Sequence, residues 1–218
     1  MSEVRIQSVM DPFDAPELMR SFLEAITLTD AMGLLAESDV VGSLDLATLR
    51  RVAEGASQAG IAPGVAATVE RLCNPRTHER RMGESDVQEL TDAIQRLREG
   101  LEQSPVPRFE WSSLLKVFDA DELSPLVGTS LSSLRRYASG TRATPDDVAE
   151  RLHFLAMVVG ELKGSYNELG IRRWFRRKRV RLGGRAPAEI LRESWSPEDP
   201  GPAEVLAIAR SLVSSPAT

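Results

Sequence analysis

The sequence predicts an all-α protein, and two observations carry this prediction. Apolar residues recur at the three- and four-residue spacing of helices along most of the chain. Strand signals are weak, because β-branched alternation is sparse and no Asn-Gly or Asp-Gly hairpin turn occurs. The 218 residues, 42% of them hydrophobic, are enough for one or two domains with buried cores. We therefore expect helical domains throughout.

Four helices are predicted before residue 105, and we expect them to form an N-terminal helical domain over 1–105. The predicted helices span 16–37, 45–58, 63–73 and 85–103, and a charged loop is expected over 75–83. The sequence assigns this domain no function beyond possible dimerisation.

The helix over 85–103 has the clearest pattern. Its apolar residues follow a 3-4-3-4 spacing: Val87, Leu90, Ile94, Leu97 and Leu101. Ser85 and Gln88 are expected to form a capping box at its start, and Gly100 is its one internal weakness. This apolar seam can pack on the chain's own core or dimerise with a second copy, and both possibilities stay open. The break over 104–107, Ser-Pro-Val-Pro, then marks the main domain boundary.

A helix-turn-helix is predicted between residues 120 and 140. Leu123 and Val127 would face inward from the first helix, and Gly128 would supply the sharp turn. Leu134 and Tyr137 would anchor the second helix to the same core. This arrangement leaves outward four side chains that can bind base edges or phosphates: Ser132, Ser133, Arg135 and Arg136.

The second helix is expected to end at Gly140, and another helix is predicted from Thr144 or Pro145 through Leu155. The turn glycine, the polar recognition helix and a closing Ser-Gly-x-Arg-x-x-Pro over 139–145 resemble the Xre/Cro family of DNA-binding domains. The resemblance implies a helix-turn-helix domain over 111–165 that binds operator DNA, with Arg142 among its DNA contacts. A second boundary is expected near 164–170.

Charge is unevenly distributed along the chain, although the net charge is only −5. Residues 1–110 carry −8, residues 111–170 carry −2, and residues 171–218 carry +5. In the segment 171–192, nine basic residues stand against one acid. Such segregation favours segments with distinct partners.

Three interpretations of the basic segment compete. It can be a nucleic-acid patch in which Trp174 and Phe175 stack on bases. It can also be the solvated face of a core formed by Trp174, Leu182, Ile190 and Leu191. The third interpretation is a resemblance to a known family of antitoxins.

The residues that carry the resemblance are Trp174-Phe175, six further residues, and then a Leu-Gly-Gly-Arg-Ala-Pro sequence beginning at Leu182. Gly183 and Gly184 allow a tight reversal, and Pro187 suits the first turn of a helix. A final helix is expected over 205–212. Downstream of the helix-turn-helix, this pattern resembles the toxin-binding domain of Xre/MbcA/ParS-type antitoxins.

The resemblance implies a small C-terminal helical toxin-binding domain over 166–218. Antitoxins of this family neutralise a RES-domain enzyme that consumes NAD or ADP-ribosylates a target, by covering its active site, and they bind their own operator DNA. The resemblance implies these partners for this chain too, together with a homodimer. Toxin contacts would involve the C-terminal helix and five residues of the basic segment: Trp174, Arg181, Gly183, Gly184 and Arg185.

Composition and motifs exclude other classes of protein, namely collagen, disulfide scaffolds and wholly disordered chains. No run approaches 18 apolar residues, and residues 1–15 lack the apolar core of a signal peptide. Cys73 is the lone cysteine, the two histidines are isolated, and no nucleophile-elbow, Walker-loop or zinc-protease sequence occurs. We therefore expect a cytoplasmic protein that is not an enzyme and needs no membrane, metal or cofactor.

Two other functions stay open. The chain can be a stand-alone transcription regulator whose N-terminal domain dimerises or senses a signal. It can also be a localisation adaptor that uses its basic segment. The C-terminal helices discriminate between these functions and the antitoxin.

Overall fold

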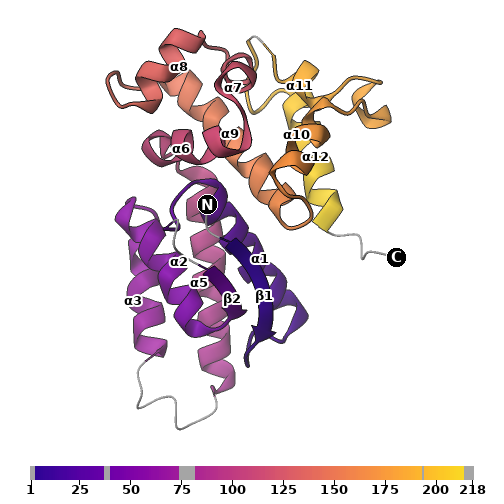
Figure 1. Ribbon diagram of the computed structural model, residues 1–218. Coiled ribbons are helices and arrows are strands. Elements are labelled where there is room, and N and C mark those ends of the chain that lie inside the picture. The colour runs from indigo at the N-terminus through magenta and orange to yellow at the C-terminus, as the bar shows by residue number, and fades with distance from the viewer. Residues whose placement is uncertain (1–2, 37–39, 74–81, 193, 214–218) are drawn as a thin grey trace. The chain divides into compact units, whose positions relative to one another are not determined.

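Helices form most of the structure, as the sequence predicts. The computed structural model describes residues 3–36, 40–73, 82–192 and 194–213 (Figure 1). The chain divides into a first unit, Met1–Asp30 with Leu34–Ser104, and a second unit, Ala31–Gly33 with Pro105–Thr218. The division falls at the Ser-Pro-Val-Pro break, where the sequence places the main boundary.

The first unit contains two strands as well as helices. Its elements are β1 (Glu3–Val9), α1 (Pro16–Ala31), β2 (Val40–Leu44), α2 (Leu46–Gln58), α3 (Pro63–Leu72) and α5 (Glu84–Gln103). The strands pair in parallel and α1 connects them. The expectation of helices throughout is therefore wrong for β1 and β2. Each strand is short, and its partner lies a whole helix away in the sequence, so no local alternation or hairpin turn announces the pair.

Local side-chain chemistry explains where these helices start. Asp45 caps α2, since its Oδ1 accepts a hydrogen bond of 2.7 Å from the Thr48 N–H. α5 begins at Glu84, and Asp86 Oδ2 accepts a hydrogen bond of 3.1 Å from the Gly83 N–H. The expected capping box of Ser85 and Gln88 is not the one that starts the helix, because the N-cap is Gly83, which has no side chain, and Asp86 alone caps it.

One helix boundary differs from the prediction. α1 ends at Ala31 rather than continuing to 37, because Gly33 adopts a left-handed φ of +76° that ends the helix. The predicted loop over 75–83 falls largely outside the described residues.

The apolar seam of α5 packs on the chain's own core. Leu90, Ile94, Leu97 and Leu101 are fully buried, so this seam is not available for dimerisation. Gly100 lies where α5 closely approaches residues 61–62, since a Cβ there would lie 3.1 Å from Ile61 Cγ2 and 3.2 Å from Ala62 Cβ.

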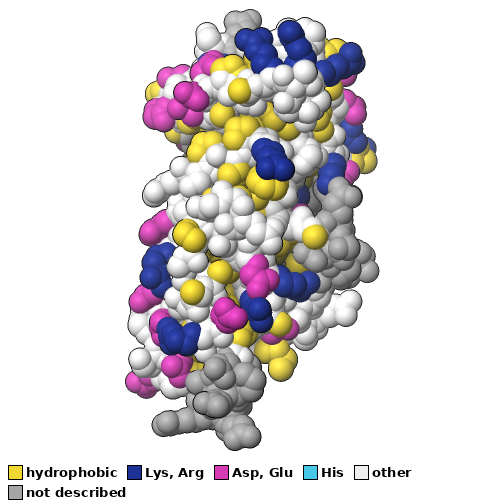
Figure 2. Space-filling view, turned by 90° about the vertical axis from the view of Figure 1, so that its left-hand side faces the viewer, with side chains coloured by type: hydrophobic (Ala, Val, Ile, Leu, Met, Phe, Trp, Pro, Cys, Tyr) yellow, Lys and Arg dark blue, Asp and Glu magenta, His cyan; other side chains and the backbone are white. Residues whose placement is uncertain are grey.

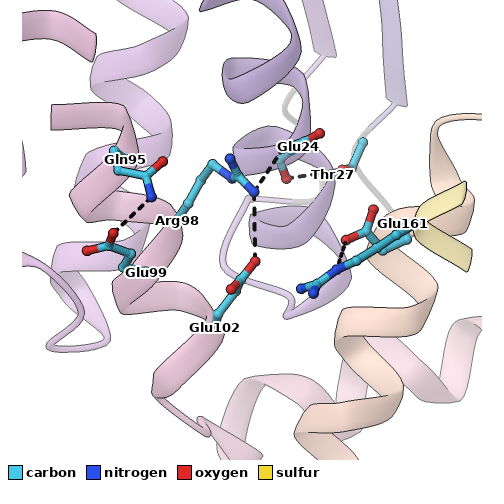
Figure 3. A network of polar contacts seen from close by, with 8 residues as sticks. Glu24, Thr27, Gln95, Arg98, Glu99, Glu102 and Glu161 are labelled. Atoms are coloured by element: carbon cyan, nitrogen blue, oxygen red, sulfur yellow. Dashed lines mark hydrogen bonds and ion pairs between the residues drawn. The ribbon is translucent and has the colours of Figure 1, made fainter. Parts of the chain in front are cut away.

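An ion-pair network links α5 to α1 (Figure 3). Arg98 Nη2 lies 2.9 Å from Glu24 Oε2 of α1 and 3.9 Å from Glu102 Oε1 of its own helix. All three side chains are partly exposed, so we expect the network to add little to the free energy of unfolding. Its main effect is on how the two helices pack.

The second unit is helical throughout. Its elements are α6 (Pro107–Val117), α7 (Ala120–Leu126), α8 (Leu131–Ala138), α9 (Asp146–Lys163), α10 (Glu168–Arg176), the 3₁₀ turn η1 (Val180–Leu182), α11 (Pro187–Ile190) and α12 (Pro200–Val213). The final helix expected over 205–212 is therefore longer than the sequence suggested.

Residues on both sides of the second expected boundary share one core. Trp195 packs edge-on against Phe154 of α9, with ring centroids 5.1 Å apart. Its Nε1–H donates a 3.0 Å hydrogen bond to the Leu126 carbonyl of α7. Phe175 of α10 packs against Phe118 in the same edge-on manner. The residues before and after 164–170 therefore belong to a single unit.

A buried acid–base pair joins α6 to α9 inside this core. Glu110 Oε1 lies 2.6 Å from His153 Nδ1, and the two residues are 0% and 4% exposed. Burial raises the pKa of the Glu110 carboxyl, and the hydrogen bond to His153 opposes that rise. Among the described residues, Glu110 Oε2 has no hydrogen-bond partner.

In the part of the chain that the structure describes, no helix is long and apolar enough to cross a membrane.

Candidate nucleic-acid and partner interfaces

α7 and α8 are two short helices joined by a turn, in the segment where the sequence predicts a helix-turn-helix. Gly128 has a φ of +69°, which allows the sharp turn after α7. Ser130 then caps α8, because its Oγ accepts a 3.2 Å hydrogen bond from the Ser133 N–H. Leu134 and Tyr137 are 1% and 7% exposed, so they anchor α8 in the core as expected.

The opposite face of α8 is polar and basic. Ser132, Arg135 and Arg136 are exposed, whereas Ser133 is half-buried and accepts a hydrogen bond from the Ser130 hydroxyl. Basic side chains gather at the top of Figure 2, at the height where Figure 1 places α8. The face predicted for DNA contact is therefore solvent-accessible.

Arg142 follows α8 and is exposed. Its guanidinium carbon lies 5.6 Å from the Tyr137 ring centroid. The backbone N–H of Arg142 donates a hydrogen bond of 3.1 Å to the Arg136 carbonyl. Among the described residues, neither Arg142 nor the two arginines of α8 has a carboxylate partner. The three guanidinium groups are thus free to meet an anionic ligand.

Trp111 positions this loop, and sequence reasoning missed it. Its indole N–H donates a 2.9 Å hydrogen bond to Thr144 Oγ1, and its ring stacks on Tyr137. The indole is buried on α6 and joins the start of α9 to the end of α8. No local pattern around residue 111 reveals these contacts, because the partners lie about thirty residues away.

The aromatic residues of the basic segment are buried. Trp174 is 3% exposed and Phe175 is 1% exposed. Neither ring can stack on a base. The interpretation of this segment as a nucleic-acid patch with stacking aromatic residues is therefore wrong. The expectation that Trp174 contacts a toxin is corrected for the same reason, since a buried indole cannot touch a partner directly.

Trp174 instead supports the loop that follows α10. The Arg179 guanidinium lies over its ring, 4.5 Å from the centroid. Burial lowers the pKa of Arg179, because the charged form loses solvation. Among the described residues, Trp174 Nε1 and Arg179 Nε have no hydrogen-bond partner. Leu182 and Leu191 are buried and Ile190 is half-buried, so the core interpretation describes the packing of this segment.

The other four expected toxin contacts are exposed on one loop. Gly183 and Gly184 have φ values of +64° and +79°, as a tight reversal requires. The loop is closed by the Arg179 N–H donating to the Arg185 carbonyl at 2.9 Å. Arg181 pairs with Glu204 of α12 at 2.7 Å, whereas Arg185 extends into solvent.

We expect Gly183→Ala to distort this loop. A side chain in the left-handed region costs about 1 kcal/mol or more, even though nothing lies within 4 Å of the added Cβ. Hydrogen exchange of the loop amides should accelerate, while exchange of α8 should not change. Gly164→Ala is the matched control, because Gly164 has an ordinary φ of −64° and open space around it. Equal exchange in the two variants would contradict the assigned role of Gly183.

A cleft of about 400 Å³ lies between α7, α10 and α11, and sequence reasoning did not find it. Phe118, Leu126 and Phe175 contribute to its apolar part. Both acidic and basic side chains line the cleft, and two of them, Arg176 and Glu122, form an ion pair. This mixture of charges selects no single class of ligand.

Among the described residues, no group of three or more side chains could hold a metal ion. Comparisons with protein-family models, with curated proteins and with solved structures found no match to this chain.

Proposed function

We propose that this chain is the antitoxin of a type II toxin–antitoxin pair and regulates its own operon by binding DNA. The observation that carries the DNA-binding part of the proposal is the exposed polar and basic face of α8, a helix anchored by Leu134 and Tyr137. In this proposal α8 enters the major groove of the operator.

Each DNA-contacting residue has a chemical role in the proposal. Arg135 and Arg136 can each donate two hydrogen bonds to guanine O6 and N7 or bind phosphates, and Ser132 can bind a base edge or a phosphate. Arg142 lies beyond the end of α8 and suits a flanking phosphate. Residues 130–142 contain three arginines and no acid, so attraction to DNA is local in a chain of net charge −5. We therefore propose salt-sensitive binding to DNA. The homodimer that would bind two half-sites is part of the proposal through the resemblance alone.

The toxin-binding part of the proposal rests on the resemblance of the C-terminal segment to Xre/MbcA/ParS-type antitoxins. It is supported by the exposure of Arg181, Gly183, Gly184 and Arg185 on one loop. The partner in this proposal is a RES-domain enzyme that consumes NAD or ADP-ribosylates a target. The chain would cover the entrance to its active site and would need no catalytic group of its own.

Co-expression with the enzyme encoded beside it tests this part of the proposal. The full chain should restore growth and the cellular NAD concentration. Arg185→Glu should weaken enzyme binding by about tenfold or more, because a charge on the interface is reversed. Arg20→Glu is the matched control, since Arg20 is an exposed residue of α1 in the first unit. A toxic enzyme that stays fully active beside the chain would favour a stand-alone regulator instead.

Point variants are preferable to a deletion of 166–218. Val205 and Ala209 of α12 are fully buried, and α12 packs along α9. Removing α12 would expose the core of the helix-turn-helix, and both activities would be lost for a trivial reason.

A further inference from the structure

The exposed apolar side chains of the second unit gather in one short stretch. Tyr166, Leu169 and Val180 are 38%, 50% and 95% exposed. The other large apolar side chains exposed among the described residues are Val9 and Met10, both in the first unit. Val180 is nearly fully exposed in a loop closed by backbone hydrogen bonds, so its side chain buries almost no apolar surface within the chain. It is the grouping of three such side chains with basic residues, and not the valine alone, that suggests an interaction surface.

These side chains belong to the outer side of α10 and its flanking segments. Leu169 and Arg173 are four residues apart on α10 and are exposed, whereas Trp174 is buried. Tyr166 lies against the first turn, because a Cβ added at Gly170 would be 3.1 Å from its side chain. Val180 follows Arg179, whose guanidinium contacts the Trp174 ring near the other end of α10.

The same stretch of sequence is strongly basic. Residues 169–188 contain eight basic residues and no acid. Arg172, Arg176 and Arg181 pair with carboxylates elsewhere in the second unit. In the described part of the chain, the other five basic residues of the stretch have no carboxylate partner. Arg179 lies over the Trp174 ring, and the remaining four are exposed: Arg173, Arg177, Lys178 and Arg185.

We propose that six residues, which we call the α10 surface, form a docking site for a protein whose carboxylates surround an apolar groove: Tyr166, Leu169, Arg173, Arg177, Lys178 and Val180. The inference rests on the proposed function in that the toxin is the expected owner of this groove. The unpaired basic residues of the α10 surface favour a partner with carboxylates around its groove, because arginine binds carboxylates bidentately. The exposed leucine and valine select the groove, because burying them against apolar groups removes that surface from water.

The same observations disfavour a nucleic acid as the partner. The two aromatic rings of this segment are buried, so only Tyr166 could stack on a base. Aliphatic side chains such as Leu169 and Val180 gain little beside phosphates. Binding of nucleic acid at this surface is therefore the alternative that the experiment must be able to detect.

Zero-length crosslinking tests the α10 surface in the full chain. Lys178 is one of only three lysines, together with Lys116 and Lys163. A carbodiimide joins a lysine amine to a carboxylate in direct contact, so treatment of the tagged protein in its native host should join Lys178 to an Asp or Glu of another protein. Lys178→Arg should abolish this crosslink and leave binding within about twofold, because the charge is kept.

Two surface variants then separate charge from apolar contact. We expect Arg173→Glu with Arg177→Glu to weaken binding to the crosslinked protein by about 100-fold and to reduce its salt dependence. Leu169→Ser with Val180→Ser should weaken it by about tenfold without changing the salt dependence. The matched controls, Arg20→Glu with Arg96→Glu and Met10→Ser, alter exposed residues of the first unit and should bind like the wild type.

The outcomes distinguish this inference from the proposed function. A crosslink to an enzyme that the chain inhibits supports both, whereas a crosslink only to an acidic protein that the chain does not inhibit contradicts both. An inhibited toxin that gives no Lys178 crosslink and binds both surface variants normally overturns only the α10 surface. The surface is also overturned if no protein is crosslinked there, or if the charge reversals weaken binding of a 30-base-pair DNA duplex but of no protein.

Discussion

Replacing Arg135 and Arg136 together by alanine is expected to abolish the mobility shift of the chain's own promoter. A well-formed arginine contact to a guanine is worth about 1–3 kcal/mol, so removing two of them should weaken binding by about 100-fold or more. The slope of log affinity against log salt should also become shallower by about one for each phosphate that the variant no longer binds. Both side chains are exposed, so the fold should not change.

Neutralisation of the toxin should survive this double replacement, because α8 is not part of the loop that carries Arg185. The control is Arg20→Ala with Arg96→Ala, which removes the same charge from exposed positions of the first unit. Equal loss of DNA binding and neutralisation in the α8 variant, with the fold intact by circular dichroism, would contradict two separate binding surfaces.

His153→Leu is expected to produce the largest loss of stability. It leaves the buried Glu110 carboxyl group without its 2.6 Å partner and removes the hydrogen bond that opposes the rise of its pKa. Breaking a buried pair in this way costs about 3–5 kcal/mol in the free energy of unfolding. Urea denaturation should therefore show a much lower midpoint for the variant than for the wild type.

Replacing both members of this pair should restore much of that stability. In the variant Glu110→Leu with His153→Leu no charge is left in the core, and such replacements are often close to neutral. Glu150→Ala is the control on α9, because Glu150 is exposed and its removal should change the free energy of unfolding by less than about 0.5 kcal/mol. A single variant as stable as the wild type would show that the pair contributes nothing.

The sequence predicts helices best where start signals and apolar spacing agree. Asp45 before α2 and Pro63 at the start of α3 mark two helix starts correctly. The apolar seam of α5 reveals one buried face. The parallel pair of β1 and β2 could not be predicted, because each strand becomes stable only when α1 brings the other beside it.

Some features of the candidate sites also follow from local sequence patterns, whereas others depend on tertiary contacts. The outward face of α8 follows from helical periodicity once Leu134 and Tyr137 are assigned to the core. The burial of Trp174 depends on Arg179 folding back over its ring, and no local pattern contains that contact. The roles of Trp111 and of the exposed Val180 likewise depend on tertiary structure.

Purification of the tagged full-length protein from its native host tests the central claim most directly. Bound proteins are identified by mass spectrometry, and bound DNA is sequenced. The account predicts a stoichiometric enzyme whose activity returns when it is separated from the chain, together with promoter DNA. A preparation that contains only the chain and DNA would contradict the antitoxin and favour a stand-alone regulator.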